Sequence, residues 1–161
     1  MRPRKYLLFD FDGTIVDSLP VLIKIYNRVA PGFKCKTVTA QEVKLLQKKR
    51  PQDFMKEYGV TLLKLPFMVV KMRSEVKNEI INLNSFYNII DVIRVLRKKN
   101  FGIGMLTTNS LSNIKMYLDS KNLQNDFDFI HTAKNIFGKH RSIKRILKKH
   151  SIQPEDLIYR G

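Results

Sequence analysis

Two aspartates that follow a short apolar run are the residues of this sequence best suited to chemistry. The run extends from Tyr6 to Phe9, and Asp10, Asp12 and Gly13 come directly after it. Carboxylates this close can divide their roles: one acts as a nucleophile or metal ligand, while the other, its pKa raised by its neighbour, carries a proton. Gly13 permits backbone angles closed to other residues, so the chain can turn sharply there. The plainer interpretation is a strand followed by an acidic turn, which a bare Asp-x-Asp spacing would favour.

A second group of polar side chains, Thr107-Thr108-Asn109-Ser110, follows an apolar run at 101–106. By itself the group favours a polar turn in which Ser110 caps the next helix. The alternative is a phosphate site, because a hydroxyl and the backbone amides at a helix N-terminus bind a phosphoryl oxygen well.

Short apolar runs alternate with helical patterns at the start of the chain and after residue 86. The runs predict four buried strands, at 6–9, 101–106, 127–130 and 156–159. Strands that alternate with helices form right-handed β-α-β crossovers and a parallel sheet. Ligands bind at the carboxyl ends of such strands, which is where both polar groups stand. The sequence therefore predicts an α/β fold with its functional residues at one edge of the sheet.

Residues 18–86 show helical patterns only. The expected helices lie at 19–29, 39–47, 51–59 and 62–81. In the last of them, Phe67 and the methionines are assigned to the core rather than to a binding groove. We expect this segment to form a second small unit above the strand ends, which could open to admit a substrate and close to exclude water.

The complete string Asp10-Phe11-Asp12-Gly13-Thr14, followed by Asp17-Ser18, is far more specific than two aspartates alone. It resembles the first signature motif of the haloacid dehalogenase-like phosphohydrolases. The resemblance extends over the entire chain and implies a Rossmann-like α/β core formed by residues 1–17 and 87–161. Residues 18–86 would be a helical cap domain inserted into that core.

Two further motifs of the family can be aligned with this chain. Thr108 matches the hydroxyl residue that holds the phosphate, commonly followed by Asn as Asn109 is here, with Thr107 as the alternative. Lys139, in Phe137-Gly138-Lys139-His140, matches the lysine that stabilises the aspartate–phosphate charge, with Lys134 as its rival. The implied phosphate-binding residues are Gly13, Thr14, Thr108 and Asn109.

The match to the family fails at the fourth motif, where the family has an apolar strand, Gly-Asp and usually a second acid that binds magnesium. Here Leu157-Ile158-Tyr159-Arg160-Gly161 reaches the glycine and the chain ends, and Arg160 stands where a small apolar residue is usual. The core is therefore expected to lack one metal-binding acid, its fifth strand and its closing helix. The strand at 156–160 should lie beside the opening strand as an exposed edge.

The resemblance implies a magnesium-dependent phosphatase of the phosphoglycolate phosphatase-like branch, acting on a small phosphorylated metabolite. Asp10 would attack phosphorus and form an aspartyl-phosphate, and Asp12 would protonate the leaving oxygen and then activate water. Asp10 and the backbone carbonyl of Asp12 would bind Mg²⁺, an ion that prefers oxygen ligands. The catalytic residues would be Asp10, Asp12 and Lys139, and the metal ligands Asp10 and Asp12.

The chain is strongly basic, with 30 Lys and Arg against 14 acids and a net charge of +16. Such a charge attracts phosphorylated molecules, nucleic acid and anionic lipid. The basic residues are scattered, however, and no aromatic-basic RNA motif is present. The single cysteine, Cys35, suits a reducing cytoplasm, and no apolar window is long enough for a transmembrane helix.

Two alternatives to the enzyme remain open. A phosphate-binding protein without catalysis is favoured by the missing fourth motif. A nucleic-acid-binding protein on a phosphatase-like fold is favoured by the net charge of +16, and would show steeply salt-dependent binding to DNA or RNA.

Overall fold

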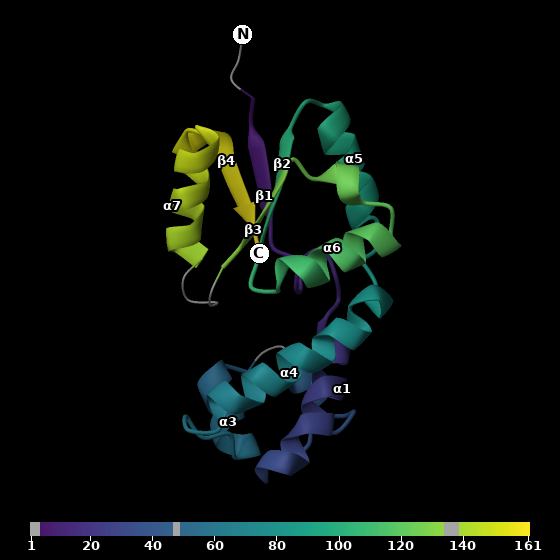
Figure 1. Cartoon of the computed structure of the whole chain (residues 1–161), viewed down its shortest axis with the longest axis vertical. Coiled ribbons are helices and arrows are strands. Elements are labelled where there is room, and N and C mark those ends of the chain that lie inside the picture. Colours follow the sequence, from purple (N-terminus) through teal and green to yellow (C-terminus); the bar gives the residue numbers. More distant parts are fainter. Residues whose placement is uncertain (1–3, 47–48, 134–138) are drawn as a thin grey trace. The chain divides into compact units, whose positions relative to one another are not determined.

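The computed structural model describes residues 4–46, 49–133 and 139–161, which form two compact units (Figure 1). The sheet unit is made of Met1–Ser18 and Ile80–Gly161, and the helical unit of Leu19–Glu79. Each unit has its own buried core, so each is described by itself.

The sheet unit contains a four-stranded parallel sheet in the order β3-β2-β1-β4. Its elements are β1 (Tyr6–Phe9), η2 (Ile80–Asn82), α5 (Ile89–Lys98), β2 (Gly102–Thr107), α6 (Leu111–Ser120), η3 (Gln124–Asp126), β3 (Phe129–Thr132), α7 (Lys139–His150), η5 (Pro154–Asp156) and β4 (Leu157–Arg160). All four predicted strands are present, shifted by at most two residues. The predicted α/β fold with a parallel sheet is therefore confirmed, and β4 lies beside β1 as expected.

Helices cover both faces of this sheet. In Figure 1, α7 lies on one side of the strands, and α5 and α6 lie on the other. Leu8 of β1, Leu106 of β2 and Ile146 of α7 belong to one buried cluster, so the apolar positions on that face of the strands pack against α7. Burying such side chains on both faces explains why the strands read as continuous apolar runs.

Two glycines of β2 allow aromatic rings to lie against the strand. A Cβ atom on Gly102 would be 2.1 Å from the Tyr6 ring, and one on Gly104 would be 2.2 Å from the Phe129 ring. The Phe129 ring is also stacked on His150 at the end of α7, with 4.0 Å between the ring centroids. Any larger residue at these glycines would displace a packed ring.

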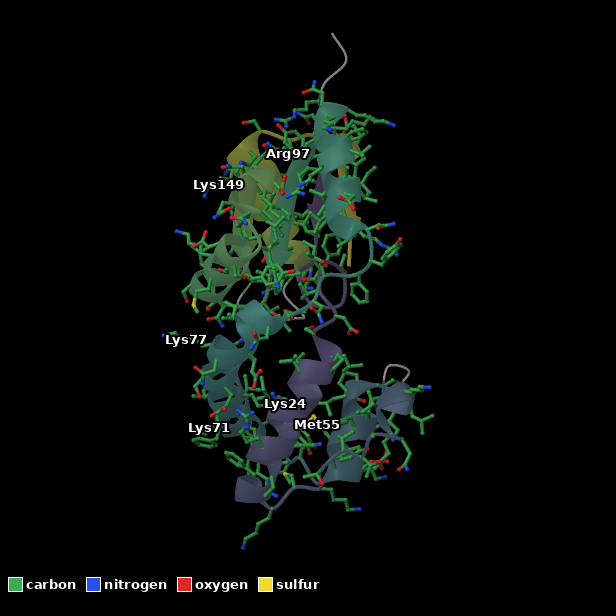
Figure 2. All side chains as sticks on the ribbon, turned by 90° about the vertical axis from the view of Figure 1, so that its right-hand side faces the viewer. Lys24, Met55, Lys71, Lys77, Arg97 and Lys149 are labelled. Carbon is green, nitrogen blue, oxygen red and sulfur yellow. The ribbon has the colours of Figure 1, made fainter. Side chains whose placement is uncertain are left out.

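Between Leu19 and Glu79, all the secondary-structure elements that the structure describes are helices. The elements are α1 (Leu19–Val29), η1 (Ala30–Phe33), α2 (Val43–Leu46), α3 (Pro51–Tyr58) and α4 (Leu65–Glu79). Tyr26, Tyr58 and Met68 are buried together in the core of this unit, and Met55, labelled in Figure 2, packs against them. Phe67 was expected in this core, but it is 69% exposed because the following residue, Met68, takes the inward position.

The expected boundary between the two parts of the chain shifts from residues 86 and 87 to residues 79 and 80. Ile80 and Leu83 are buried within the sheet unit. Ser85 forms an isolated antiparallel bridge with Val16, and the two connecting segments run side by side there. The sequence pattern at 62–81 predicted a helix that runs past residue 79. The pattern could not distinguish the two cases, because an apolar residue such as Ile80 can lie on the buried face of that helix or in the core of the other unit.

No helix in the described part of the chain is long and apolar enough to cross a membrane.

Candidate active site

The end of β1 brings Asp10 to the carboxyl edge of the sheet. The Asp10 backbone N–H donates a 2.8 Å hydrogen bond to the carbonyl of Arg160, so pairing with β4 continues one residue beyond the strand. The Asp10 side chain is buried, and its Oδ1 accepts a 2.9 Å hydrogen bond from the Phe11 N–H. Such partners matter because burying an unpaired carboxylate is costly.

A tight turn follows Asp10. The carbonyl of Phe11 accepts a 3.1 Å hydrogen bond from the Val16 N–H, and the Gly13 N–H donates a 2.9 Å bond to the Val16 carbonyl. Gly13 has a φ of 75°, in the left-handed region that a glycine adopts without strain. The predicted sharp turn after the two acids is therefore present, and half-buried Thr14 lies within it.

Asp12 is half-buried within this turn, and its surroundings favour the protonated form. Burial is the largest cause and raises the pKa of the Asp12 carboxyl. A hydrogen bond from Ser18 opposes this rise, the charge of Asp10 adds to it, and the charge of Lys139 lowers it again. The net result is a raised pKa, because loss of hydration penalises the charged carboxylate.

Lys139, the first residue of α7, forms a hydrogen-bonded ion pair with Oδ2 of Asp10. Burial alone would lower the pKa of the Lys139 ammonium, but the hydrogen bond and the charge of Asp10 outweigh it, so the pKa is raised. The fold thus joins two predicted site residues that are 129 positions apart in sequence. Lys134, the alternative lysine, lies outside the described residues.

The polar segment after β2 is organised around the start of α6. Thr107 is fully buried, and its Oγ1 accepts a 3.0 Å hydrogen bond from the Asn109 N–H, whereas Thr108 is half-buried. Ser110 is the N-cap predicted from the sequence, with its Oγ accepting a 3.2 Å bond from the Asn113 N–H. The Asn109 Oδ1 accepts from the Ser110 N–H and from Asn113 Nδ2.

The register of the sheet brings the two polar segments to one edge. Phe9, the last residue of β1, lies opposite Met105, and β2 continues two residues further to Thr107, so the two parallel strands end at the same edge of the sheet. The described residues include no hydrogen bond between Asp10 and either Thr108 or Asn109. Asp10 follows the end of β1, and Thr108 and Asn109 follow the end of the neighbouring strand β2. Lys139, by contrast, contacts Asp10 directly.

Two residues at this edge were missed by the sequence reasoning as parts of the site. Ser18 is buried, and its interaction with the Asp12 carboxyl lowers the pKa of that group. Tyr159 of β4 has its hydroxyl next to Gly161, on the side where Asp10 lies, and it contributes to the raised pKa of the Lys139 ammonium. Ser18 was part of the first motif, but no role was assigned to it. Tyr159 could have been found because side chains alternate between the two faces along β4, which puts Tyr159 on the same face as Leu157.

The metal-ligand set is small in the described ranges. No three His, Cys, Asp or Glu side chains come together there in a group that could hold a metal ion. The oxygen donors at the edge of the sheet are the carboxylates of Asp10 and Asp12 and the backbone carbonyls beside them. Oxygen donors of this kind suit Mg²⁺, which keeps several water ligands when few protein groups bind it.

The fold and this edge define an α/β protein with a candidate ligand site at the carboxyl end of its central strand β1. The family model described as haloacid dehalogenase-like hydrolase matches residues 7–161. This protein belongs to the haloacid dehalogenase-like hydrolase family, as its motifs predicted.

Individual proteins agree with this membership. The chain is 25% identical over 155 residues to a phosphoglycolate phosphatase of Synechococcus elongatus, covering 96% of this chain and 73% of that protein. A haloacid dehalogenase-like family hydrolase from Streptococcus pneumoniae has the same fold, with a TM-score of 0.79 at 21% identity over 100% of this chain and 77% of that one. CbbY from Rhodobacter sphaeroides, solved in complex with phosphate, has a TM-score of 0.71 at 16% identity over 98% and 77% of the two chains.

Proposed function

We propose that this protein is a magnesium-dependent phosphomonoester hydrolase that acts through an aspartyl-phosphate on Asp10. The observation that carries the proposal is the contact of the Lys139 ammonium with the Asp10 carboxylate at the end of β1. A cation there offsets the repulsion between a carboxylate nucleophile and an anionic phosphate. The likeness to a phosphoglycolate phosphatase over nearly the whole chain supports the same class of reaction.

In the first step, a carboxylate oxygen of Asp10 attacks the phosphorus atom of the substrate and forms an acyl phosphate. The bond between phosphorus and the ester oxygen breaks, and that oxygen leaves as an alcohol after taking the proton of Asp12. The raised pKa of Asp12 supports this role, because a larger fraction of the carboxyl groups then carries the proton.

In the second step, the Asp12 carboxylate accepts a proton from water, and the water oxygen attacks the phosphorus. The bond from phosphorus to Asp10 breaks, which releases inorganic phosphate and restores the carboxylate. Lys139 stays beside the Asp10 oxygen on which negative charge returns, so it stabilises this step as well.

Phosphate binding is assigned to Thr108 rather than Thr107. The Thr107 side chain is fully buried, and its hydroxyl oxygen already accepts a hydrogen bond from the Asn109 N–H. Thr108 is half-buried, and its hydroxyl takes part in none of the hydrogen bonds found among the described residues. The start of α6 adds its positive dipole end to this segment. Gly13 and Thr14, in the turn after Asp12, are the other proposed phosphate contacts.

Asp10 and the Asp12 carbonyl are the residues that would hold Mg²⁺. The ion, when bound, would neutralise charge on the phosphate and fix its orientation. Their oxygen chemistry fits this ion, although the described residues offer no third carboxylate to complete the set.

The helical unit, Leu19–Glu79, is proposed to act as the cap that selects the substrate. This unit has a hydrophobic core of its own, formed by aromatic and apolar side chains of its helices. The proposed substrate class is a small phosphorylated metabolite, which the net charge of +16 would attract.

Replacing Asp10 by Asn tests the proposal. Wild type should release phosphate from p-nitrophenyl phosphate and from a panel of phosphorylated metabolites when Mg²⁺ is present, and EDTA should stop the release. Asp10→Asn should abolish it, because an amide is not a nucleophile of this kind. Borohydride reduces an aspartyl-phosphate to the primary alcohol of homoserine and releases the phosphate, so mass spectrometry after reduction during turnover should find homoserine in place of Asp10.

Asp119→Asn is the matched control, since it removes an exposed carboxylate on α6. Both variants should unfold as wild type does. Activity of Asp10→Asn within about tenfold of wild type, an activation difference of only about 1.4 kcal/mol, would contradict the assignment. Phosphate binding without any turnover in wild type would instead favour the non-catalytic alternative.

A further inference from the structure

Two histidine side chains meet between β3 and the end of α7. His131 is the third residue of β3, His150 is the last residue of α7, and their Nε2 atoms are 2.9 Å apart. The two residues are 19 positions apart in the sequence, so only the fold brings them together. Both are half-buried, which leaves part of each ring open to water.

The Phe129 ring holds both imidazoles in place. It is stacked on His150, with 4.0 Å between the ring centroids, and it meets His131 edge to face at 5.7 Å. Phe129 is itself packed against β2, where a Cβ atom on Gly104 would be 2.2 Å from its ring. The directions of both Nε2 atoms are therefore set by packing before any ligand binds.

The distance between the two nitrogens fits one shared metal ion. Transition-metal dications bind imidazole nitrogens at about 2.0–2.1 Å. Two such nitrogens lie about 2.9 Å apart when their bonds to the metal meet at a right angle, and about 3.3 Å apart around a tetrahedral Zn²⁺. The observed 2.9 Å matches the first arrangement and has to open by only a few tenths of an ångström for the second.

The pair can present two lone pairs to an ion without losing a proton. In the neutral pair, one Nε2 donates its proton to the other, and moving that proton to Nδ1 of the same ring frees both Nε2 atoms. Burial and then the charge of Lys149 lower the pKa of both histidines, which favours the neutral form that binds metals. Lys149 also repels a bound cation and so weakens the site.

We propose that His131 and His150 bind a Zn²⁺ ion through their Nε2 atoms, with water completing the coordination. Imidazole nitrogen suits this ion, whereas Mg²⁺ prefers oxygen ligands. The site is separate from the contact of Lys139 with Asp10, because Lys139 and His150 are the two ends of α7, about 16 Å apart along the helix. The described residues offer no third protein ligand, so the affinity is lower than that of a structural zinc site.

NMR of the histidine rings tests the site in wild type, without substrate or Mg²⁺. The chain contains three histidines, and the third, His140, is exposed on the first turn of α7. Its signal is identified by its loss in His140→Asn. Addition of Zn²⁺ should shift the signals of His131 and His150 together and leave the signal of His140 in place. Equal shifts of all three signals, or no shift of the pair, would overturn the proposal.

Calorimetric titration with Zn²⁺ compares the affinities of matched variants. His150→Phe keeps a ring for stacking on Phe129 but has no nitrogen, and it should bind Zn²⁺ at least about tenfold more weakly than wild type. His140→Asn should bind as wild type does. Because the site joins β3 to α7 only in the folded chain, Zn²⁺ should also raise the unfolding temperature of wild type and of His140→Asn, but not of His150→Phe. Wild-type affinity in His150→Phe, or displacement of Zn²⁺ by excess Mg²⁺, would place the ion elsewhere and overturn the proposal.

Discussion

Asp10 and Asp12 are two residues apart, yet their surroundings differ in the way an acid and a nucleophile require. Asp10 is buried, with one oxygen on the Phe11 N–H and the other on the Lys139 ammonium, both of which stabilise the carboxylate. Asp12 has a raised pKa, mainly because of burial. Environments that separate the proton affinities of two carboxyl groups are how one site performs both acid and nucleophilic chemistry.

The raised pKa of Asp12 has a consequence for stability. In the folded protein its pKa lies above the unfolded value of 3.8, so the charged carboxylate lowers the free energy of unfolding at neutral pH. Asp12→Asn, which keeps the shape and an acceptor for Ser18, should therefore be more stable than wild type at neutral pH in EDTA. The difference should shrink as the pH falls through the folded pKa and should vanish below 3.8, where the carboxyl is neutral in both the folded and the unfolded protein.

Urea unfolding of the two proteins across this pH range measures the difference directly, since the other carboxylates titrate in both. Asp119→Asn, on the exposed surface of α6, serves as the control and should show no such trend. A variant less stable than wild type at neutral pH would show that the charged form of Asp12 is stabilised in the fold.

At the scale of the elements, β2 is the strand whose packing is most tightly specified. All six of its residues are buried, and its two glycines face the rings of Tyr6 and Phe129. The Phe129 ring cannot simply rotate away, because it is stacked on His150 of α7. This arrangement links the packing of β2 to the C-terminal end of α7.

Gly104→Ala should therefore destabilise the protein by about 1–3 kcal/mol, the usual cost of adding an atom to a packed core. Its Cβ would lie 2.2 Å from the Phe129 ring and 3.0 Å from Leu8 Cδ1. The unfolding midpoint in urea or on heating measures this loss. Gly32→Ala, where no atom lies within 4 Å of the new Cβ, should be close to neutral.

If the Phe129 ring causes the loss of stability in Gly104→Ala, a smaller side chain at position 129 should reduce that loss. Phe129→Leu in the Gly104→Ala background should lose less stability than the sum of the two single changes. Additive losses would place the strain elsewhere in β2.

At the scale of the whole molecule, the described residues include one buried cluster within the helical unit and another within the sheet unit, and the two share no residue. The core of the helical unit is built on Tyr26, Phe54 and Tyr58, with the last two rings stacked at a centroid distance of 4.5 Å. The core facing α7 in the sheet unit is built on Leu8, Leu106 and Ile146. Two cores without shared residues allow one unit to loosen while the other keeps its structure.

Tyr58→Ala should show this independence. Removing a side chain that is only 2% exposed should cost about 3–5 kcal/mol within the helical unit. Hydrogen exchange followed by mass spectrometry should detect faster exchange in α1, α3 and α4, with β1 and β2 still protected. Leu8→Ala is the reciprocal variant and should expose β1 and β2. Equal loss of protection in both units after Tyr58→Ala would show that they unfold as one.

Most of the elements and most of the candidate site residues could be predicted from the amino-acid sequence alone. The apolar runs gave the four strands, Ser110 gave the start of α6, and Gly13 gave the turn after the acids. These features are local: side-chain periodicity, a capping hydroxyl and a permitted backbone angle act within a few residues. For that reason they can be recognised in one sequence without knowledge of the fold.

Which of these residues come into contact could be seen only in the folded protein. It alone brought Lys139 to Asp10 across 129 positions and placed the Tyr159 hydroxyl on the side of Gly161 where Asp10 lies. It also buried Thr107 while leaving Thr108 half-exposed, and it assigned Ile80 to the sheet unit. Such outcomes depend on strand register, crossovers and competition between two cores for apolar residues. Those quantities are set by packing over the whole chain, and no local pattern encodes them.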